Sequence, residues 1–291
     1  MSHYSNPEVP HEVNVSEKTP LRDFARLSLG LCLLAAVVVA AVFFMARLFA
    51  PKIPFRYEAA LNDTLPQGFA HRVAAPACRI AGEAALQHLA EELALAMALS
   101  EEMRLHVHFN DSADPNAFAT LGGNIVVQRG LLQHVASENA LAMVLAHEIA
   151  HIQHRDPIVS IGGGVAVAVL FSALIGNSDG GVLVGWAIGF TQMRFSRDQE
   201  SAADDAALKA LQARYGHTHG ADEFFAYILA SHPNISRIPT FLSTHPTPPA
   251  RLETIRKSFS PTPQKLTPLP EALRQLQECG IKPDASLIGA S

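Results

Sequence analysis

The chain has 291 residues, enough for one large domain or two small ones. Hydrophobic residues make up 48 % and charged residues 17 % of the chain, and so low a charged fraction is typical of a protein with membrane-embedded parts. The net charge of -5 leaves no global basic field, which argues against a nucleic-acid partner.

The N-terminal region predicts a membrane anchor. Residues 1–26 are polar and are expected to form a disordered tail, and an uncharged run follows over residues 27–46. A helix of that length is about 30 Å long, the thickness of the hydrocarbon core of a bilayer. A cleaved signal peptide is the alternative, but its apolar region would be shorter. Three basic residues lie on each side of the run, so the positive-inside rule does not set its orientation.

Residues 47–75 contain Pro51, Pro54 and Pro66 and are predicted to be a linker to the main domain, which is expected at residues 76–260. Helical periodicity follows over 80–98, and residues 104–109 alternate as a strand does. Two short strands are predicted around a Leu-Gly-Gly turn within 116–132. Ser137 is the expected N-cap of a helix over 138–155, which Pro157 ends. These elements indicate a mainly α fold of the α+β kind with a small sheet beside a central helix.

A second uncharged stretch lies between Asp156 and Asp179, and a shorter run interrupted by glycine follows to residue 193. We expect residues 157–193 to form a buried or membrane-dipping helical pair, and a hairpin of two spans is the alternative. Further helices are predicted over 197–215, 221–231, 248–258 and 270–278. Residues 261–291 hold a Pro-rich spacer, the last of these helices and a tail.

The chain contains Cys32, Cys78 and Cys279, and no C-x-x-C pair, which excludes a cysteine-based zinc or redox motif. Cys32 lies inside the first apolar run. Cys78 and Cys279 could form a disulfide if the domain is exported, and two buried free thiols are the alternative.

The segment "LAMVLAHEIAHIQHRDP" contains the motif H-E-x-x-H at His147, Glu148 and His151. Residues four apart lie above one another on a helix, so both imidazoles point the same way and can hold one Zn²⁺. Glu148 lies beside them, turned toward a water, as a general base would be. Chance predicts about 0.04 such motifs in a chain of this composition. The alternative is a pair of hydrogen-bonded structural histidines.

A zinc hydrolase needs a third protein ligand, and Glu200 in "QESAADD" is the best candidate. Asp204 lies one helical turn later, where it could accept the free ring N–H of a ligand histidine, and Asp156 could pair near the site. The alternative is a solvated acidic helix face. His245 or Arg251, in "THPTPPAR", could donate to the oxyanion of a peptide bond under attack.

These motifs resemble the gluzincin metallopeptidases typified by HtpX, BepA and the CAAX prenyl proteases. "HEIAH", then "ESAAD" about 50 residues later, then His245-Pro246 with Arg251, follow the family's order, and the likeness covers roughly residues 75–258. It implies a zincin-like endopeptidase with one Zn²⁺ held by His147, His151 and Glu200 and with Glu148 as base. It implies that Asp204 supports a ligand and that His245 and Arg251 assist the transition state. "NAFATLGGNIVVQRGLL" is similar to the family's segment before the active-site helix. A substrate strand would add there, which implicates Asn116, Ala117, Phe118, Gly122 and Gly123.

The departures from the family narrow the expectation. HtpX-like members have two spans before the motif, the CAAX proteases have many more, and BepA-like members append helical repeats. The chain is therefore similar to a single-anchor branch that includes a mitochondrial inner-membrane stress protease. That likeness implies a peptidase in the bacterial inner membrane, anchored through lipid contacts, with its catalytic domain in the periplasm and misfolded or damaged envelope and membrane proteins as polypeptide substrates. The alternatives are a zinc-binding chaperone or scaffold, and a latent protease with little constitutive cleavage.

Overall fold

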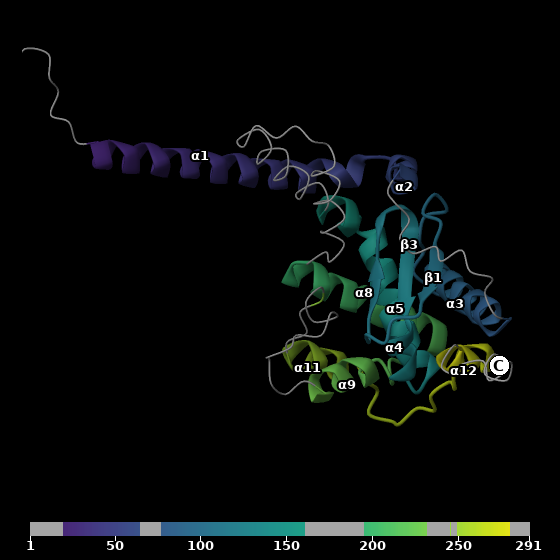
Figure 1. The fold of residues 1–291 in the computed structure, drawn as a ribbon. Coiled ribbons are helices and arrows are strands. Elements are labelled where there is room, and N and C mark those ends of the chain that lie inside the picture. The colour runs from purple at the N-terminus through teal and green to yellow at the C-terminus, as the bar shows by residue number, and fades with distance from the viewer. Residues whose placement is uncertain (1–19, 65–76, 161–194, 232–244, 246–248, 280–291) are drawn as a thin grey trace, which may run out of the picture.

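Helices surround a small mixed sheet in this computed structural model, which describes residues 20–64, 77–160, 195–231, 245 and 249–279 (Figure 1). Strand β1 (His106–Asn110) pairs in parallel with β3 (Asn124–Gln128), and β2 (Ala117–Ala119) pairs antiparallel with β3. The strand order β1-β3-β2 leaves β2 at one edge of the sheet. The predicted class, mainly α with a small sheet beside the central helix, is confirmed.

Helix α5 (Glu138–Gln153) is the central element, and nearly all of its residues are buried. Its start is fixed as predicted, because the Ser137 side chain accepts a hydrogen bond from Ala140 N at 3.1 Å. Helix α8 (Arg197–Tyr215) packs along α5. A capping box of Ser196 and Gln199 begins α8, and Gly216 ends it at a φ of 73°, where a glycine is favoured. This packing brings two segments some fifty residues apart in the sequence together.

Helix α3 (Ala77–Ala96) packs against α5 and β1, and α12 (Glu271–Glu278) packs against α3. The approach of α12 is close, because a Cβ atom on Gly82 would lie 2.6 Å from Leu276 Cδ2. Short helices α4 (Arg129–Gln133), α9 (Glu223–Ser231) and α11 (Pro249–Lys257) complete the domain. Each predicted helix outside residues 157–193 is therefore present, within a few residues of its expected bounds.

Helix α1 (Pro20–Phe49) extends away from the domain (Figure 1). Its segment Pro20–Val42 has a mean hydropathy of 2.3 and is not buried within the chain, and in the described part of the chain it alone is long and apolar enough to cross a membrane. By length and composition, this helix is compatible with the predicted N-terminal anchor. The prediction of a disordered tail over residues 1–26 is wrong for residues 20–26, which belong to α1, and residues 1–19 are not described. Of the hydrophobic residues 157–193, the described residues 157–160 are helical and the rest lie outside the described residues.

The region predicted as a linker contains a docked helix. After η1 (Ala50–Lys52), helix α2 (Phe55–Thr64) packs against η2 (Leu121–Gly123), the turn between β2 and β3. Phe55 and Glu58 lie on one face of α2, and their exposed fractions are 4 % and 1 %. Among residues 55–60, whose burial the structure describes, two buried positions are too few to give a periodic signal, which explains why the prolines dominated the sequence prediction. Residues 65–76 are not described.

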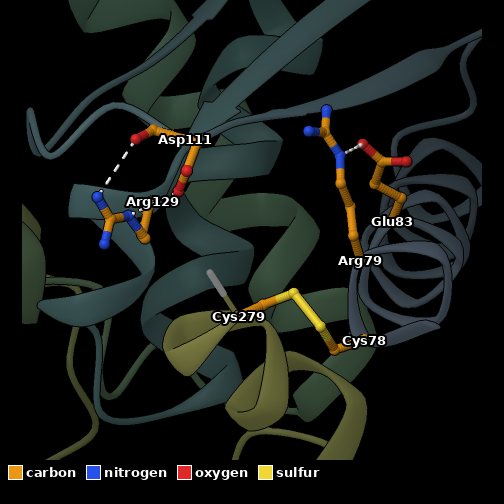
Figure 2. The surroundings of a disulfide bond; sticks show 6 residues. All are labelled: Cys78, Arg79, Glu83, Asp111, Arg129 and Cys279. Atoms are coloured by element: carbon orange, nitrogen blue, oxygen red, sulfur yellow. Dashed lines mark hydrogen bonds and ion pairs between the residues drawn. A yellow bond between two sulfur atoms is a disulfide. The ribbon is translucent and has the colours of Figure 1, made fainter. Parts of the chain in front are cut away.

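A disulfide joins Cys78 to Cys279, with their Cα atoms 6.1 Å apart (Figure 2). It ties the first turn of α3 to the end of α12 and closes a loop over 201 residues. Nearby, Arg79 Nη2 donates to the carbonyl oxygen of Phe109 at 2.8 Å, which links the same turn of α3 to β1. Of the two alternatives that the sequence allows for these cysteines, the structure has the disulfide. Cys32, in α1, is free and exposed.

The disulfide should contribute measurably to stability, because it closes a long loop in the unfolded chain. Replacing both cysteines, in the variant Cys78→Ser/Cys279→Ser, should lower the free energy of unfolding by about 2–4 kcal/mol. Chemical unfolding of the full-length protein in detergent, followed by near-ultraviolet circular dichroism, measures the change. Cys32→Ser is the matched control and should have no effect. Equal stability of the double variant and this control would contradict the prediction.

Candidate metal centre

Two histidines and a glutamate meet inside the domain. His147 and His151 lie one turn apart on α5, with their Nε2 atoms 3.1 Å apart. The carboxylate oxygens of Glu200, on α8, lie 3.5 Å from His147 Nε2 and 3.6 Å from His151 Nε2. All three side chains are at most 1 % exposed. The structure thus brings together the three residues that the sequence predicts as ligands.

His245 lies in the same cluster. Its Nδ1 atom is 3.3 Å from His147 Nε2 and 3.0 Å from a carboxylate oxygen of Glu200. One nitrogen or oxygen atom from each of His147, His151, Glu200 and His245 lies within 4.8 Å of all the others. His245, which was predicted from the sequence to assist the transition state, is therefore the fourth residue of the cluster.

Carboxylates on the far side of the rings set their tautomers. Nδ1 of His147 lies 3.0 Å from Asp204 Oδ1, and Nδ1 of His151 lies 2.8 Å from Asp156 Oδ2. A carboxylate accepts a hydrogen bond, so each Nδ1 carries a proton, and in the neutral form of each ring Nε2 presents a lone pair to the cluster. Two lone pairs 3.1 Å apart repel unless a cation lies between them. Nitrogens that ligate a tetrahedral zinc ion are about 3.3 Å apart, so the pair fits such an ion.

His147 and His151 have very different pKa values. Burial lowers the pKa of His147, but hydrogen bonds to Asp204 and Glu200, and the negative charges of both, outweigh burial and raise it to about 10. Burial also lowers the pKa of His151, to about 3, because the bond to Asp156 offsets only part of that cost and the charges of His147 and His245 add to it. Without a metal, His147 therefore carries a second ring proton near neutral pH, on the Nε2 atom that faces the cluster, whereas His151 stays neutral.

Arg251, on α11, lies behind the carboxylates. Its Nε and Nη2 atoms donate to Asp204 at 2.7 and 2.8 Å, and its Nη1 atom donates to Glu200. Burial alone would raise the pKa of Asp204, but hydrogen bonds from His147 and Arg251 outweigh it and lower the pKa. Through these contacts Arg251 orients Asp204 and Glu200. The sequence suggests instead that Arg251 donates directly to the reacting carbonyl.

Glu148 lies in the same turn of α5 and is fully buried. Its Oε2 atom accepts a hydrogen bond from Ala119 N at 2.8 Å, and its Oε1 atom lies 3.5 Å from His245 Nε2. Burial raises the pKa of Glu148 above its ordinary value, and the charges of His245 and His147 offset only part of that rise. A buried carboxyl group with a raised pKa beside a metal-ligand cluster suits proton transfer.

The predicted substrate segment divides into two parts. Ala117 and Phe118 belong to β2, at the edge of the sheet, and Asn116 precedes them and is 1 % exposed. Gly122 and Gly123 lie in η2, where α2 packs against them. The N–H of Gly122 donates to Glu58 Oε1 at 3.2 Å. Both glycines have positive φ, and a Cβ atom on Gly123 would lie 2.0 Å from the carbonyl oxygen of Arg104. Their described contacts are therefore those of turn and packing residues.

Several contacts of the cluster are not readable from the sequence. Phe195 stacks on the His151 ring with the ring centroids 3.9 Å apart, and Gln199 Nε2 donates to Asp156 Oδ1 at 2.6 Å. In the sequence, the spacing of Gln199 from Ser196 indicates only a helix capping box and gives no sign of the contact with Asp156. The pairing of Asp156 near the site is found as expected. His154, which has no predicted ligand role, is the exposed C-cap of α5.

A family model described as Peptidase family M48 matches residues 81–258. The matched span contains the four residues of the cluster, together with Glu148. It agrees closely with the span over which the motifs alone show their resemblance. Among curated proteins, none matches the chain.

Metal binding to the metal-free protein should release about one proton at neutral pH, because the metal must displace the proton that His147 holds with a pKa of about 10. The apparent affinity should therefore rise with pH across the neutral range, by about tenfold per pH unit. Calorimetric titration with zinc in buffers of different ionisation enthalpy measures the release. Asp204→Asn removes a group that raises the pKa of His147, so this variant should release fewer protons when it binds zinc. A binding enthalpy independent of the buffer would contradict the prediction.

Proposed function

The chain belongs to peptidase family M48, whose members are metal-dependent peptidases, and on this premise we propose that it is a membrane-anchored zinc endopeptidase. One observation carries the proposal: a buried cluster of metal-ligand atoms lies beside a buried glutamate on the same helix. A metal site that only stabilised the fold would need no such base. This argues against the alternative of a zinc-binding chaperone or scaffold.

We assign His147, His151 and Glu200 as the ligands of one zinc ion. Two imidazole nitrogens and a carboxylate oxygen form a donor set typical of catalytic zinc, whereas magnesium and calcium prefer oxygen alone. Asp204 and Asp156 hold the two rings in the tautomer that ligation requires. Arg251 in turn fixes Asp204 and Glu200 through its guanidinium group.

A bound zinc ion would lower the pKa of water to near 7 and polarise the peptide carbonyl. Glu148 takes the proton of the attacking water and delivers it to the leaving nitrogen. The Ala119 N–H holds Oε2 of Glu148, and Oε1 accepts no hydrogen bond from the described residues, so Oε1 is the atom that we assign to the proton transfer. The raised pKa of Glu148 suits both steps, the uptake of the proton from water and its delivery to the leaving nitrogen. His245 lies near enough to Glu148 to donate to the developing oxyanion.

We propose that the substrate is a locally unfolded polypeptide. The edge strand β2 lies beside Glu148, and a substrate can add to such an edge only as an extended segment with unpaired backbone groups. Native domains rarely offer such segments, whereas misfolded or damaged proteins do. This requirement supports a role in the quality control of envelope and membrane proteins.

We also propose that the domain lies on the periplasmic side of a bacterial inner membrane. The disulfide between Cys78 and Cys279 supports this placement, because disulfides persist in oxidising compartments and are rare in the cytosol. The flanking basic residues do not decide the orientation, so the disulfide is the stronger argument. Helix α1 would then be the anchor, in contact with lipid.

A second candidate function is a latent peptidase, and the position of His245 favours it. Catalytic zinc sites keep a position open for water or substrate, whereas His245 Nδ1 lies 3.3 Å from His147 Nε2 and brings the cluster to four protein donors. In such a protein, cleavage would require that His245 first leave the cluster.

Glu148→Gln should abolish cleavage without loss of metal, because the amide keeps the shape of the side chain but cannot take a proton. We expect the cleavage rate of an unfolded test protein to fall by about 10²–10⁴-fold while the zinc content stays at that of the wild type. Glu200→Gln is the matched comparison on the facing helix and should lose metal. Proteolysis assays and zinc quantification on the three proteins check both expectations. Equally poor cleavage by wild type and Glu148→Gln across metals and detergents would exclude the peptidase, and equally efficient cleavage would exclude Glu148 as the base.

His245→Ala should distinguish the two candidate functions. If His245 donates to the oxyanion, the variant should bind zinc and cut about 10²–10³-fold more slowly than the wild type. This slower cleavage is the expected result. Faster cleavage, measured with the same test protein and equal zinc content, would instead support the latent peptidase.

A further inference from the structure

We propose that helix α2, which follows the anchor, positions the metal centre, and that Glu58 and Arg155 are positioning residues that lock it in place. The proposal rests on the proposed metallopeptidase function and concerns residues outside its ligand set. Helix α2 begins at Phe55, directly after the short segment that leaves the anchor. Phe55 and Glu58 turn toward the domain and are buried there, whereas Arg56, Tyr57 and Ala60 are exposed.

Glu58 bonds to two separate parts of the domain. Its Oε2 atom accepts a hydrogen bond from Arg155 Nε at 2.9 Å and forms an ion pair with Arg155 Nη2 at 2.8 Å. Its Oε1 atom accepts one from Gly122 N at 3.2 Å. Arg155 Nη1 donates to the carbonyl oxygen of Ile53 at 2.9 Å, so the same guanidinium also holds the chain before α2. One buried ion pair therefore fixes the exit from the anchor against the end of α5.

The backbone at Arg155 shows why this side chain matters. Arg155 follows the C-cap of α5 and has a φ of 63°, a left-handed conformation that helix ends usually assign to glycine. Its guanidinium also lies over the Phe55 ring, 5.3 Å from the centroid. The contacts of the side chain thus hold a backbone conformation that arginine seldom adopts.

The turn at Arg155 sets the position of Asp156. Through that turn, Asp156 Oδ2 reaches Nδ1 of His151 at 2.8 Å, and Asp156 Oδ1 accepts from Gln199, the neighbour of Glu200. A continuous series of contacts therefore leads from Glu58 through Arg155 and Asp156 to two of the proposed ligands.

The other oxygen of Glu58 leads to the base. Gly122 follows β2 by three residues, and Ala119 of β2 donates to Glu148. Glu58 is therefore linked both to the ligand His151, through Arg155 and Asp156, and to the base Glu148, through the segment from Gly122 to Ala119. A buried ion pair adds little stability compared with a well-packed apolar pair, so stability alone does not account for it, whereas it does fix the distance between the groups it joins.

The test compares Glu58→Gln with Glu138→Gln in the full-length protein in detergent. Glu138 begins α5, at the opposite end of the helix from Arg155, and is also buried, accepting from Arg214 Nη2 at 2.9 Å and Tyr215 Oη at 2.8 Å. Zinc affinity and the visible spectrum of the cobalt-substituted protein are measured without substrate, and kcat and KM with an unfolded test protein. Glu58→Gln should bind zinc about tenfold more weakly. It should also change the cobalt spectrum and lower kcat more than it raises KM.

Glu138→Gln should lose stability but keep the zinc affinity and the cobalt spectrum of the wild type. Equal affinities and spectra of the two variants would overturn the proposal. If Glu58→Gln does not fold, Glu58→Leu/Arg155→Met replaces it, since an apolar pair leaves no buried charge. Wild-type zinc affinity in that double variant would overturn the proposal as well. Because metal binding is measured without substrate, the result stands even if the wild type cuts no peptide.

Discussion

Two imidazole nitrogens held 3.1 Å apart on one buried helix are the constraint on which the rest of the structure depends. In the neutral rings each of these nitrogens presents a lone pair, because the Nδ1–H on the other side of the ring donates to a carboxylate. Such a pair is stable only with a cation between the rings, either a proton or a metal ion. The surrounding fold is arranged to hold this pair and to supply the negative charge that a metal ion needs.

Charge burial explains how the domain is built around the cluster. An isolated buried carboxylate is costly, so each one in the site has a partner: Asp204 is paired with His147 and Arg251, and Asp156 with His151 and Gln199. These partners come from α5, α8 and α11, which lie far apart in the sequence. The packing of α8 along α5, and of α11 against α8, holds the helices that carry them. Stability of the fold and geometry of the site therefore have the same origin.

The sequence predicted those features that depend on local spacing. His147 and His151 were found because they lie one helical turn apart, and Ser137 begins their helix as predicted. The helix ends at Gln153, before the turn at Arg155, and not at Pro157, which lies in the next helical segment. Glu200 was identified because a zinc hydrolase needs a third ligand, and the resemblance to known metallopeptidases supported it, since an acidic helix face alone is common. Contacts between distant segments had no such signal. Glu58 and Arg155 are 97 residues apart, and the left-handed backbone of Arg155 has no mark in the sequence. The pairing of Cys78 with Cys279 could be listed only as one of two alternatives.

X-ray absorption at the zinc edge of the full-length, zinc-loaded protein tests the central claim most directly. We predict a shell of nitrogen and oxygen neighbours at about 2.0–2.1 Å, with the outer-shell scattering of at least two imidazole rings and no sulfur. A sulfur neighbour at about 2.3 Å, or a shell of oxygen atoms alone, would show that the metal binds elsewhere and would contradict the assignment of His147, His151 and Glu200.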